Sequence, residues 1–141
     1  MTIRLQNDTL LLPQYIRDNY EITTLNNPLA ILKGVYPQEW NDLIELLERF
    51  TLNEYDIITP GGSKTPIARK LDGFLYDRGW IEAGFDIQFS VNGEVAKLPT
   101  HKVDCFKNRI GIEIEWNNKD PFFDRDLNNF RLLYDYDALD V

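Results

Sequence analysis

Three acidic side chains in the C-terminal half of the chain have a spacing that could support chemistry. Glu113 and Glu115 alternate with isoleucine in the run IGIEIEW, and Asp104 precedes them in the run KVDCF. Residues two apart on a β-strand point to the same face, so the two glutamates would share one face. A turn at the intervening KNR would place Asp104 on the neighbouring strand beside Glu113. Carboxylates this close repel one another unless a cation lies between them, and Mg²⁺ is a hard cation that prefers oxygen ligands.

A second interpretation of the same residues stays open. Glu113 and Glu115, with Asp104, also fit the solvent-facing side of a half-exposed antiparallel strand, although acids are depleted from strands as a class. The functional interpretation indicates phosphate chemistry, because a metal held by these carboxylates would polarise a phosphoryl oxygen and could generate hydroxide from water.

The elements that must position these acids begin with helices. The clearest is YPQEWNDLIELLERF, where Pro37 suits the first turn and apolar residues recur every three or four positions. A second helix is expected in TPIARKLDGFLYDRGW, with Thr65 as N-cap, Pro66 at the first helical position and Gly79 as its stop. Residues 1–35 predict one helix broken near Pro13, followed by an extended segment.

A third helix is expected in DPFFDRDLNNFRLLYDYDAL, with Asp120 as N-cap. Its apolar stripe is expected to consist of Phe123, Leu127, Phe130 and Leu133 or Tyr134.

Between the second and third helices the pattern changes to alternation. FDIQFSV, EVAKLPTHKVDCF and IGIEIEW predict three strands, and the Asn-Gly pair after the first favours a hairpin. The expected fold class is α+β, with N-terminal helices, then an antiparallel three-stranded meander followed by a helix. Residues 1–141 are expected to form a single domain.

The composition is that of a globular protein with no membrane span or signal-peptide core. The net charge is −8, yet the segment from Ser63 to Arg109 has a net charge of +2, which is compatible with a local phosphate-facing surface. Cys105 is the only cysteine, which fits a reducing compartment, and we expect a cytoplasmic protein.

Asp, then a hairpin's length, then Glu-x-Glu resembles the signature of the PD-(D/E)xK nuclease superfamily. The run HKVDCFKNRIGIEIEWNNKDPFFDRDLNNFRLL and the upstream GGSKTPIARKLDGFLYDRGWIE are similar to the BglII/BamHI-like type II restriction endonucleases. The resemblance covers residues 35–141. It implies a restriction-endonuclease-like core and Mg²⁺-dependent, site-specific hydrolysis of double-stranded DNA by a homodimer.

Carried over to this sequence, the resemblance makes Asp104 and Glu113 metal ligands. Glu115 takes the place of the usual lysine and would act on the attacking water as a general base. Glu82 is a candidate fourth acid near the metal. The alternative interpretation is that Glu82 is a surface acid at the start of a strand. Lys102 as a displaced catalytic lysine and His101 as a catalytic group are weaker alternatives.

Candidate DNA contacts flank these acids. Six polar or basic residues could approach the DNA backbone, or could simply be solvated: Ser63, Lys64, Arg69, Lys70, Asn117 and Lys119.

The resemblance also implies that family members continue past the point where this sequence stops. We therefore expect an incomplete nuclease-type catalytic domain, truncated at the C-terminus, that pairs through an open strand edge or belongs to a longer polypeptide. Two other classes stay open. One is a catalytically inactive nuclease scaffold that binds DNA or protein, and the other is an acidic regulatory protein that resembles DNA.

Overall fold

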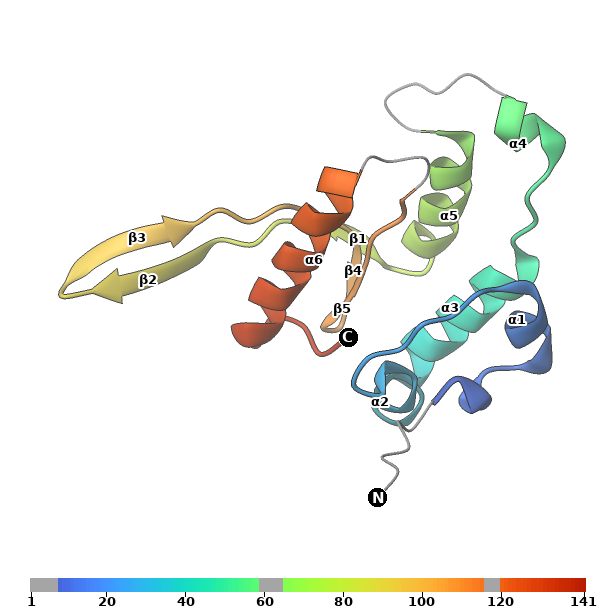
Figure 1. Ribbon diagram of the computed structural model, residues 1–141, viewed down its shortest axis with the longest axis horizontal. Coiled ribbons are helices and arrows are strands. Elements are labelled where there is room, and N and C mark those ends of the chain that lie inside the picture. Colours follow the sequence, from blue (N-terminus) through green and yellow to red (C-terminus); the bar gives the residue numbers. More distant parts are fainter. Residues whose placement is uncertain (1–7, 59–64, 116–119) are drawn as a thin grey trace. The chain divides into compact units, whose positions relative to one another are not determined.

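The computed structural model describes residues 8–58, 65–115 and 120–141. The chain forms two compact units, Met1–Ile58 with Val141, and Thr59–Asp140 (Figure 1). The predicted α+β class is confirmed: helices come first, a three-stranded antiparallel sheet follows, and a helix lies at the C-terminal end. Within the described ranges, no helix has the length and apolar character needed to cross a membrane.

The first unit is helical. Its elements are η1 (Asp8–Leu11), α1 (Gln14–Asn19), α2 (Pro28–Val35), α3 (Pro37–Arg49) and α4 (Glu54–Ile58). The helix predicted from YPQEWNDLIELLERF is confirmed as α3, with Pro37 in its first turn and Arg49 in its last. Tyr20 ties the end of α1 to α3, because its hydroxyl donates to the Leu47 carbonyl at 2.6 Å.

Helix α2 corrects the expectation of an extended segment before residue 36. Asn27 has a left-handed backbone (φ 57°), and Pro28 then starts the helix. Asp8 stabilises that start from a distance in the sequence, because its Oδ2 accepts hydrogen bonds from the backbone N–H of Leu29 at 2.7 Å and of Ala30 at 3.1 Å. A carboxylate at a helix N-terminus is favourable, but a cap supplied by a remote residue leaves no local pattern to read.

The second unit carries the sheet strands and the three acids of interest. Its elements are α5 (Pro66–Tyr76), β1 (Ile81–Ala83), β2 (Ile87–Val91), β3 (Glu94–Leu98), β4 (Val103–Lys107), β5 (Ile110–Ile112) and α6 (Asp120–Asp135). The predicted N-cap of α5 is confirmed, because Thr65 Oγ1 accepts a hydrogen bond from the Ala68 N–H at 3.2 Å. Gly79 follows in the turn after α5 with φ +83°, a conformation that glycine adopts without strain.

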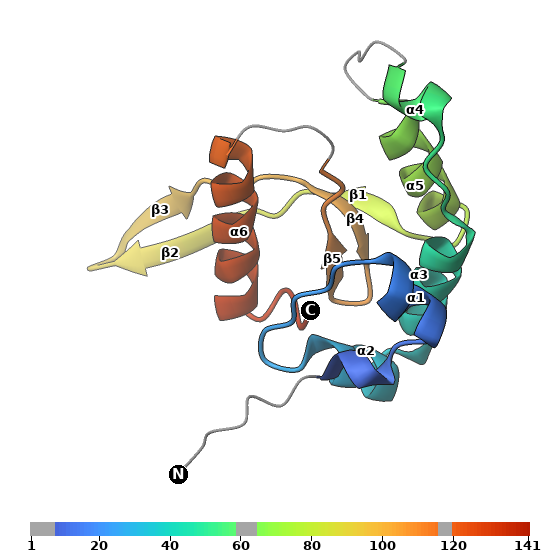
Figure 2. The ribbon, with the colours of Figure 1, turned by 45° about the vertical axis from the view of Figure 1, so that its right-hand side comes forward.

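The three-stranded sheet has the order β1-β4-β5, whereas β2 and β3 form a separate hairpin. The expected meander of three consecutive runs is therefore wrong in its strand membership. The run EVAKLPTHKVDCF splits into β3 and β4 around Pro99 and Thr100, since a proline has no N–H for a ladder. Strand β4 then pairs with β1 on one side and β5 on the other. The hairpin extends away from the sheet in both ribbon views (Figure 1, Figure 2).

Helix α6 packs on this unit through a core of Val103, Leu133 and Leu139. Phe130 packs against the same core, so two members of the predicted apolar stripe are confirmed. The prediction that Phe123 and Leu127 belong to this buried stripe is wrong, because Phe123 is 43% exposed and Leu127 is 66% exposed. The buried positions one turn earlier are polar instead, namely Asp126 and Asn129.

Candidate active site

The β4–β5 hairpin carries Asp104 and leads into the two glutamates. Asn108 and Arg109 both have positive φ angles and form the turn predicted at KNR. Cys105 pairs with Ile112, and regular pairing ends there, so Glu113 to Glu115 lie just beyond the ladder and not within a longer strand as expected. Beyond the last strand pair, the Asp104 side chain bonds to the backbone of the following segment, because its Oδ2 accepts a hydrogen bond from the Ile114 N–H at 3.3 Å.

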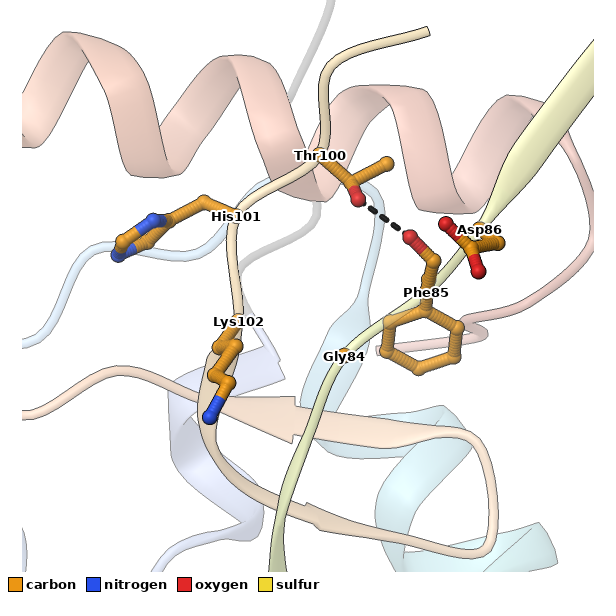
Figure 3. A pocket seen from close by; sticks show the side chains of 6 residues that line it. All are labelled: Gly84, Phe85, Asp86, Thr100, His101 and Lys102. Carbon is orange, nitrogen blue, oxygen red and sulfur yellow. Dashed lines mark hydrogen bonds between the residues drawn. The ribbon is translucent and has the colours of Figure 1, made fainter. Parts of the chain in front are cut away.

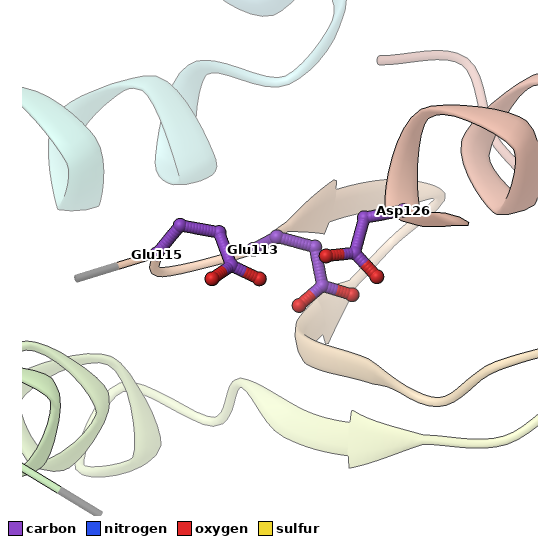
Figure 4. A group of neighbouring side chains, drawn as sticks. All are labelled: Glu113, Glu115 and Asp126. Atoms are coloured by element: carbon purple, nitrogen blue, oxygen red, sulfur yellow. The ribbon is translucent and has the colours of Figure 1, made fainter. Parts of the chain in front are cut away.

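Glu113 and Glu115 lie together with a third acid that comes from α6. One carboxylate oxygen from each of Glu113, Glu115 and Asp126 lies within 4.8 Å of the other two. Figure 4 shows the three side chains pointing toward one another from the segment after β5 and from the helix. Across the described parts of the chain, this is the one group of three or more potential metal-ligating side chains.

The surroundings of the two glutamates favour their protonated, uncharged forms. Burial, the charge and hydrogen bond of Asp104, and the charges of Asp126 and Glu115 raise the pKa of Glu113 to about 8. Burial and the hydrogen bond and charge of Asp126 raise the pKa of Glu115 to about 7, against a smaller opposing effect of Arg125. Asp104 is thus an electrostatic neighbour of Glu113, although it is not one of the three mutually close acids.

Asp126 behaves in the opposite way. Burial acts to raise its pKa, but hydrogen bonds with Arg125 and Glu115 outweigh burial and hold the pKa below its usual value. Arg125 Nε donates to Asp126 Oδ1 at 2.9 Å. The group therefore contains one carboxylate held in its charged form beside two whose charging is opposed.

Each of the three acids also has one buried oxygen that lacks a hydrogen-bond partner among the described residues: Glu113 Oε1, Glu115 Oε2 and Asp126 Oδ2. Leaving a buried polar atom unpaired is costly, more so when it is charged. A hard divalent cation takes carboxylate oxygens as ligands. The donor set therefore fits Mg²⁺ or a similar ion.

Glu82, the fourth candidate acid, lies elsewhere. It is exposed on β1, and its Oε1 forms an ion pair with Lys102 Nζ. Lys102 in turn lines a cavity of about 290 Å³ between Gly84–Asp86 and Thr100–Lys102 (Figure 3). The structure thus brings Glu82 to Lys102 and does not place it in the group of three acids.

His101 has an exposed side chain, and its backbone is fixed from α6. Asn129, which is 6% exposed, accepts from the His101 N–H at 3.0 Å and donates to the His101 carbonyl at 2.9 Å. This pair of hydrogen bonds fastens the segment just before β4 to the helix that carries Asp126.

Two of the six candidate DNA contacts can be placed. Arg69 and Lys70 are both exposed on α5. The other four, Ser63, Lys64, Asn117 and Lys119, lie outside the described residues.

Sequence reasoning missed Asp126 and Asn129. A signal was present, because Asp126, Asn129, Phe130 and Leu133 are spaced as one helix face, at i, i+3, i+4 and i+7. The predicted stripe contains apolar residues only, and it therefore runs through Phe123 and Leu127. Two polar residues in line with the buried Leu133 indicate a helix face that carries chemistry or a specific hydrogen bond.

Comparison with protein families finds a match between residues 20–141 and the model described as restriction endonuclease BglII/BglIII. Comparisons with curated proteins and with solved structures found no significant match.

Proposed function

The chain belongs to the BglII/BglIII restriction endonuclease family and is thus a nuclease of the type II restriction class, and we propose that it hydrolyses double-stranded DNA using Asp104, Glu113, Glu115 and Mg²⁺. The observation that carries this proposal is the convergence of Glu113 and Glu115 with a further buried acid, beside Asp104. Unpaired carboxylate oxygens at that point support a cation-binding role over a solvated strand face.

In this proposal Asp104 and Glu113 hold the cation. Mg²⁺ bound there would supply charge to stabilise a phosphoryl oxygen and would lower the pKa of water. Glu115 accepts the proton of the attacking water, and a pKa of about 7 suits a general base that works near neutral pH. Asp104 has a second task, since its hydrogen bond to the Ile114 N–H fixes the backbone between the two glutamates.

Contacts to DNA are proposed for the basic and polar residues that flank the acids, namely Ser63, Lys64, Arg69, Lys70, Asn117 and Lys119. Exposure of Arg69 and Lys70 on α5 supports their part in this. Contacts of this kind set affinity and register, because they meet the phosphate backbone and not the base edges. Glu82 is proposed only as a more distant acid, since its ion pair with Lys102 already satisfies its charge.

A homodimer in the cytoplasm completes the proposal. Cutting both strands of a duplex takes two hydrolytic events, and two copies of the chain would supply two sites. Strand β5 is an edge of the three-stranded sheet as far as the described residues go, and an edge strand can pair with a second chain.

The test is cleavage of mixed plasmid DNA by the purified chain with and without Mg²⁺. We expect discrete fragments that require Mg²⁺, and their loss in Glu113→Gln. Glu94→Gln is the matched control, because Glu94 is an exposed acid on β3 and loses the same charge. A chain that binds DNA in a gel-shift assay without cutting it would instead favour the inactive nuclease scaffold.

A further inference from the structure

Asp126 has surroundings that its pairing with Arg125 does not explain. The Asp126 side chain is 5% exposed, while that of Arg125 is 41% exposed. Adjacent residues on a helix point in different directions, so this contact is a weak reason to bury a carboxylate. Oδ1 accepts from Arg125, and Oδ2 is buried with no hydrogen-bond partner among the described residues.

The Asp126 carboxylate lies beside those of Glu113 and Glu115. Figure 4 shows the Asp126 side chain reaching from α6 toward both glutamates. The carboxylate oxygens of the three residues lie within 4.8 Å of one another. Ligand oxygens about 2.0–2.6 Å from a common Mg²⁺ or Ca²⁺ ion are separated from one another by about 3–5 Å. The spacing therefore matches one coordination shell.

From this geometry we propose that Asp126 is a ligand of the active-site cation, binding through Oδ2 beside Glu113. This inference rests on the proposed function and extends its metal site to an acid on α6. Glu115 remains next to the cation, where its role as a base requires it to be. The charge of Arg125 offsets part of the negative charge that a further carboxylate adds.

The position of Asp126 is fixed by the packing of α6 and not by a loop. One turn along the helix, Asn129 holds the His101 backbone with two hydrogen bonds, and two turns along, Leu133 is fully buried in the core. These contacts lie on the same face as Asp126. A ligand held in this way needs little reorganisation when the ion binds.

The experiment measures cation binding directly. Calorimetric titration of Mg²⁺, and of Ca²⁺ as a second cation, is carried out on the 141-residue chain and on Asp126→Asn and Asp126→Ala. Asp124→Asn is the matched control, since Asp124 is an exposed acid on the same helix and loses the same charge. Circular dichroism checks that each variant keeps its fold.

We expect both Asp126 variants to bind the cations about tenfold more weakly or worse, while Asp124→Asn stays within about twofold of the parent chain. Unchanged cation affinity in both Asp126 variants would overturn this inference alone. Absence of binding by the parent chain would overturn it together with the proposed metal site.

Discussion

The raised pKa values of the two glutamates predict that the metal-free protein loses stability as the pH rises. The folded state raises the pKa of Glu113 from 4.5 to about 8 and that of Glu115 to about 7, through burial and neighbouring acids. An acid with a raised pKa keeps its proton in the folded chain and releases it in the unfolded chain. The stabilising contribution is therefore fully present below about pH 4.5 and declines up to about pH 8.

The size of the effect follows from one proton at Glu113. A difference of one bound proton changes the free energy of unfolding by about 1.4 kcal/mol per pH unit, or about 2.7 kcal/mol from pH 5 to pH 7. Glu113 is only partly buried, so water screens its charge and reduces the expected loss to about 1–1.5 kcal/mol. A cation bound to the charged carboxylates reverses the trend, because its affinity rises as the acids lose their protons.

The measurement is urea unfolding at pH 5, 6, 7 and 8, followed by circular dichroism, with a chelator and again with Ca²⁺. Comparison with Glu113→Gln isolates the contribution of this residue, and Glu94→Gln controls for the loss of an exposed acid. We expect a smaller decline with pH in Glu113→Gln than in the parent chain. Equal declines in the parent chain and Glu113→Gln would refute the reasoning.

Three further predictions concern single side chains. Glu115→Ala should abolish cleavage while sparing cation and DNA binding, and an equal loss of DNA affinity in a gel shift with Ca²⁺ would contradict this. Asn129→Ala removes both hydrogen bonds to His101 and should cost about 1–3 kcal/mol of unfolding free energy, with the exposed neighbour Asn128→Ala as a near-neutral control. Leu133→Ala opens a cavity at a fully buried position and should cost about 2–5 kcal/mol in urea unfolding; a loss below 1 kcal/mol would show that α6 is not held by this core.

Helices with local start signals could be predicted from the sequence. Helix α3 begins at Pro37, whose ring fixes φ in the first turn. Helix α5 begins at Pro66, directly after the N-cap Thr65. Helix α2 was missed although Pro28 was visible, because its start is stabilised by Asp8, far away in the sequence. Local signals predict local structure, and a remote cap is a tertiary contact.

Strand pairing was harder to predict for a similar reason. Alternation identified FDIQFSV and its Asn-Gly turn, which form the β2–β3 hairpin. Alternation could not show that the three-residue segment Ile81–Ala83 forms a strand. It also could not show that this strand, and not the β2–β3 hairpin, pairs with β4. Pairing partners depend on which strands the core brings together, and Val103 of β4 lies in that core with α6.

The candidate site shows the same division between local pattern and tertiary contact. Asp104, Glu113 and Glu115 could be proposed from period-two spacing and from their resemblance to nucleases. The helix spacing of Asp126 with Asn129, Phe130 and Leu133 indicates its face of the helix, but its approach to Glu113 and Glu115 depends on how α6 packs, which is a tertiary contact. A buried polar position on an otherwise core-facing helix is the kind of local conflict that marks functional sites.

Mutually repelling acids can persist in this unit because other contacts position the chain on both sides of them. At the turn between β4 and β5, Arg109 pairs with Asp137 and Asp140, each at 2.7 Å, and its carbonyl accepts from the Asp140 N–H at 2.8 Å. These contacts tie the hairpin that carries Asp104 to the chain just after α6. On the other side, Asn129 ties α6 to the segment before β4.

The helix and the hairpin are thus joined at two places, and the acids are held near one another by contacts that do not involve their own charges. A bound cation would then gain its affinity from repulsion already present in the folded chain, which is the physical reason to expect tight metal binding and reduced metal-free stability in the same molecule.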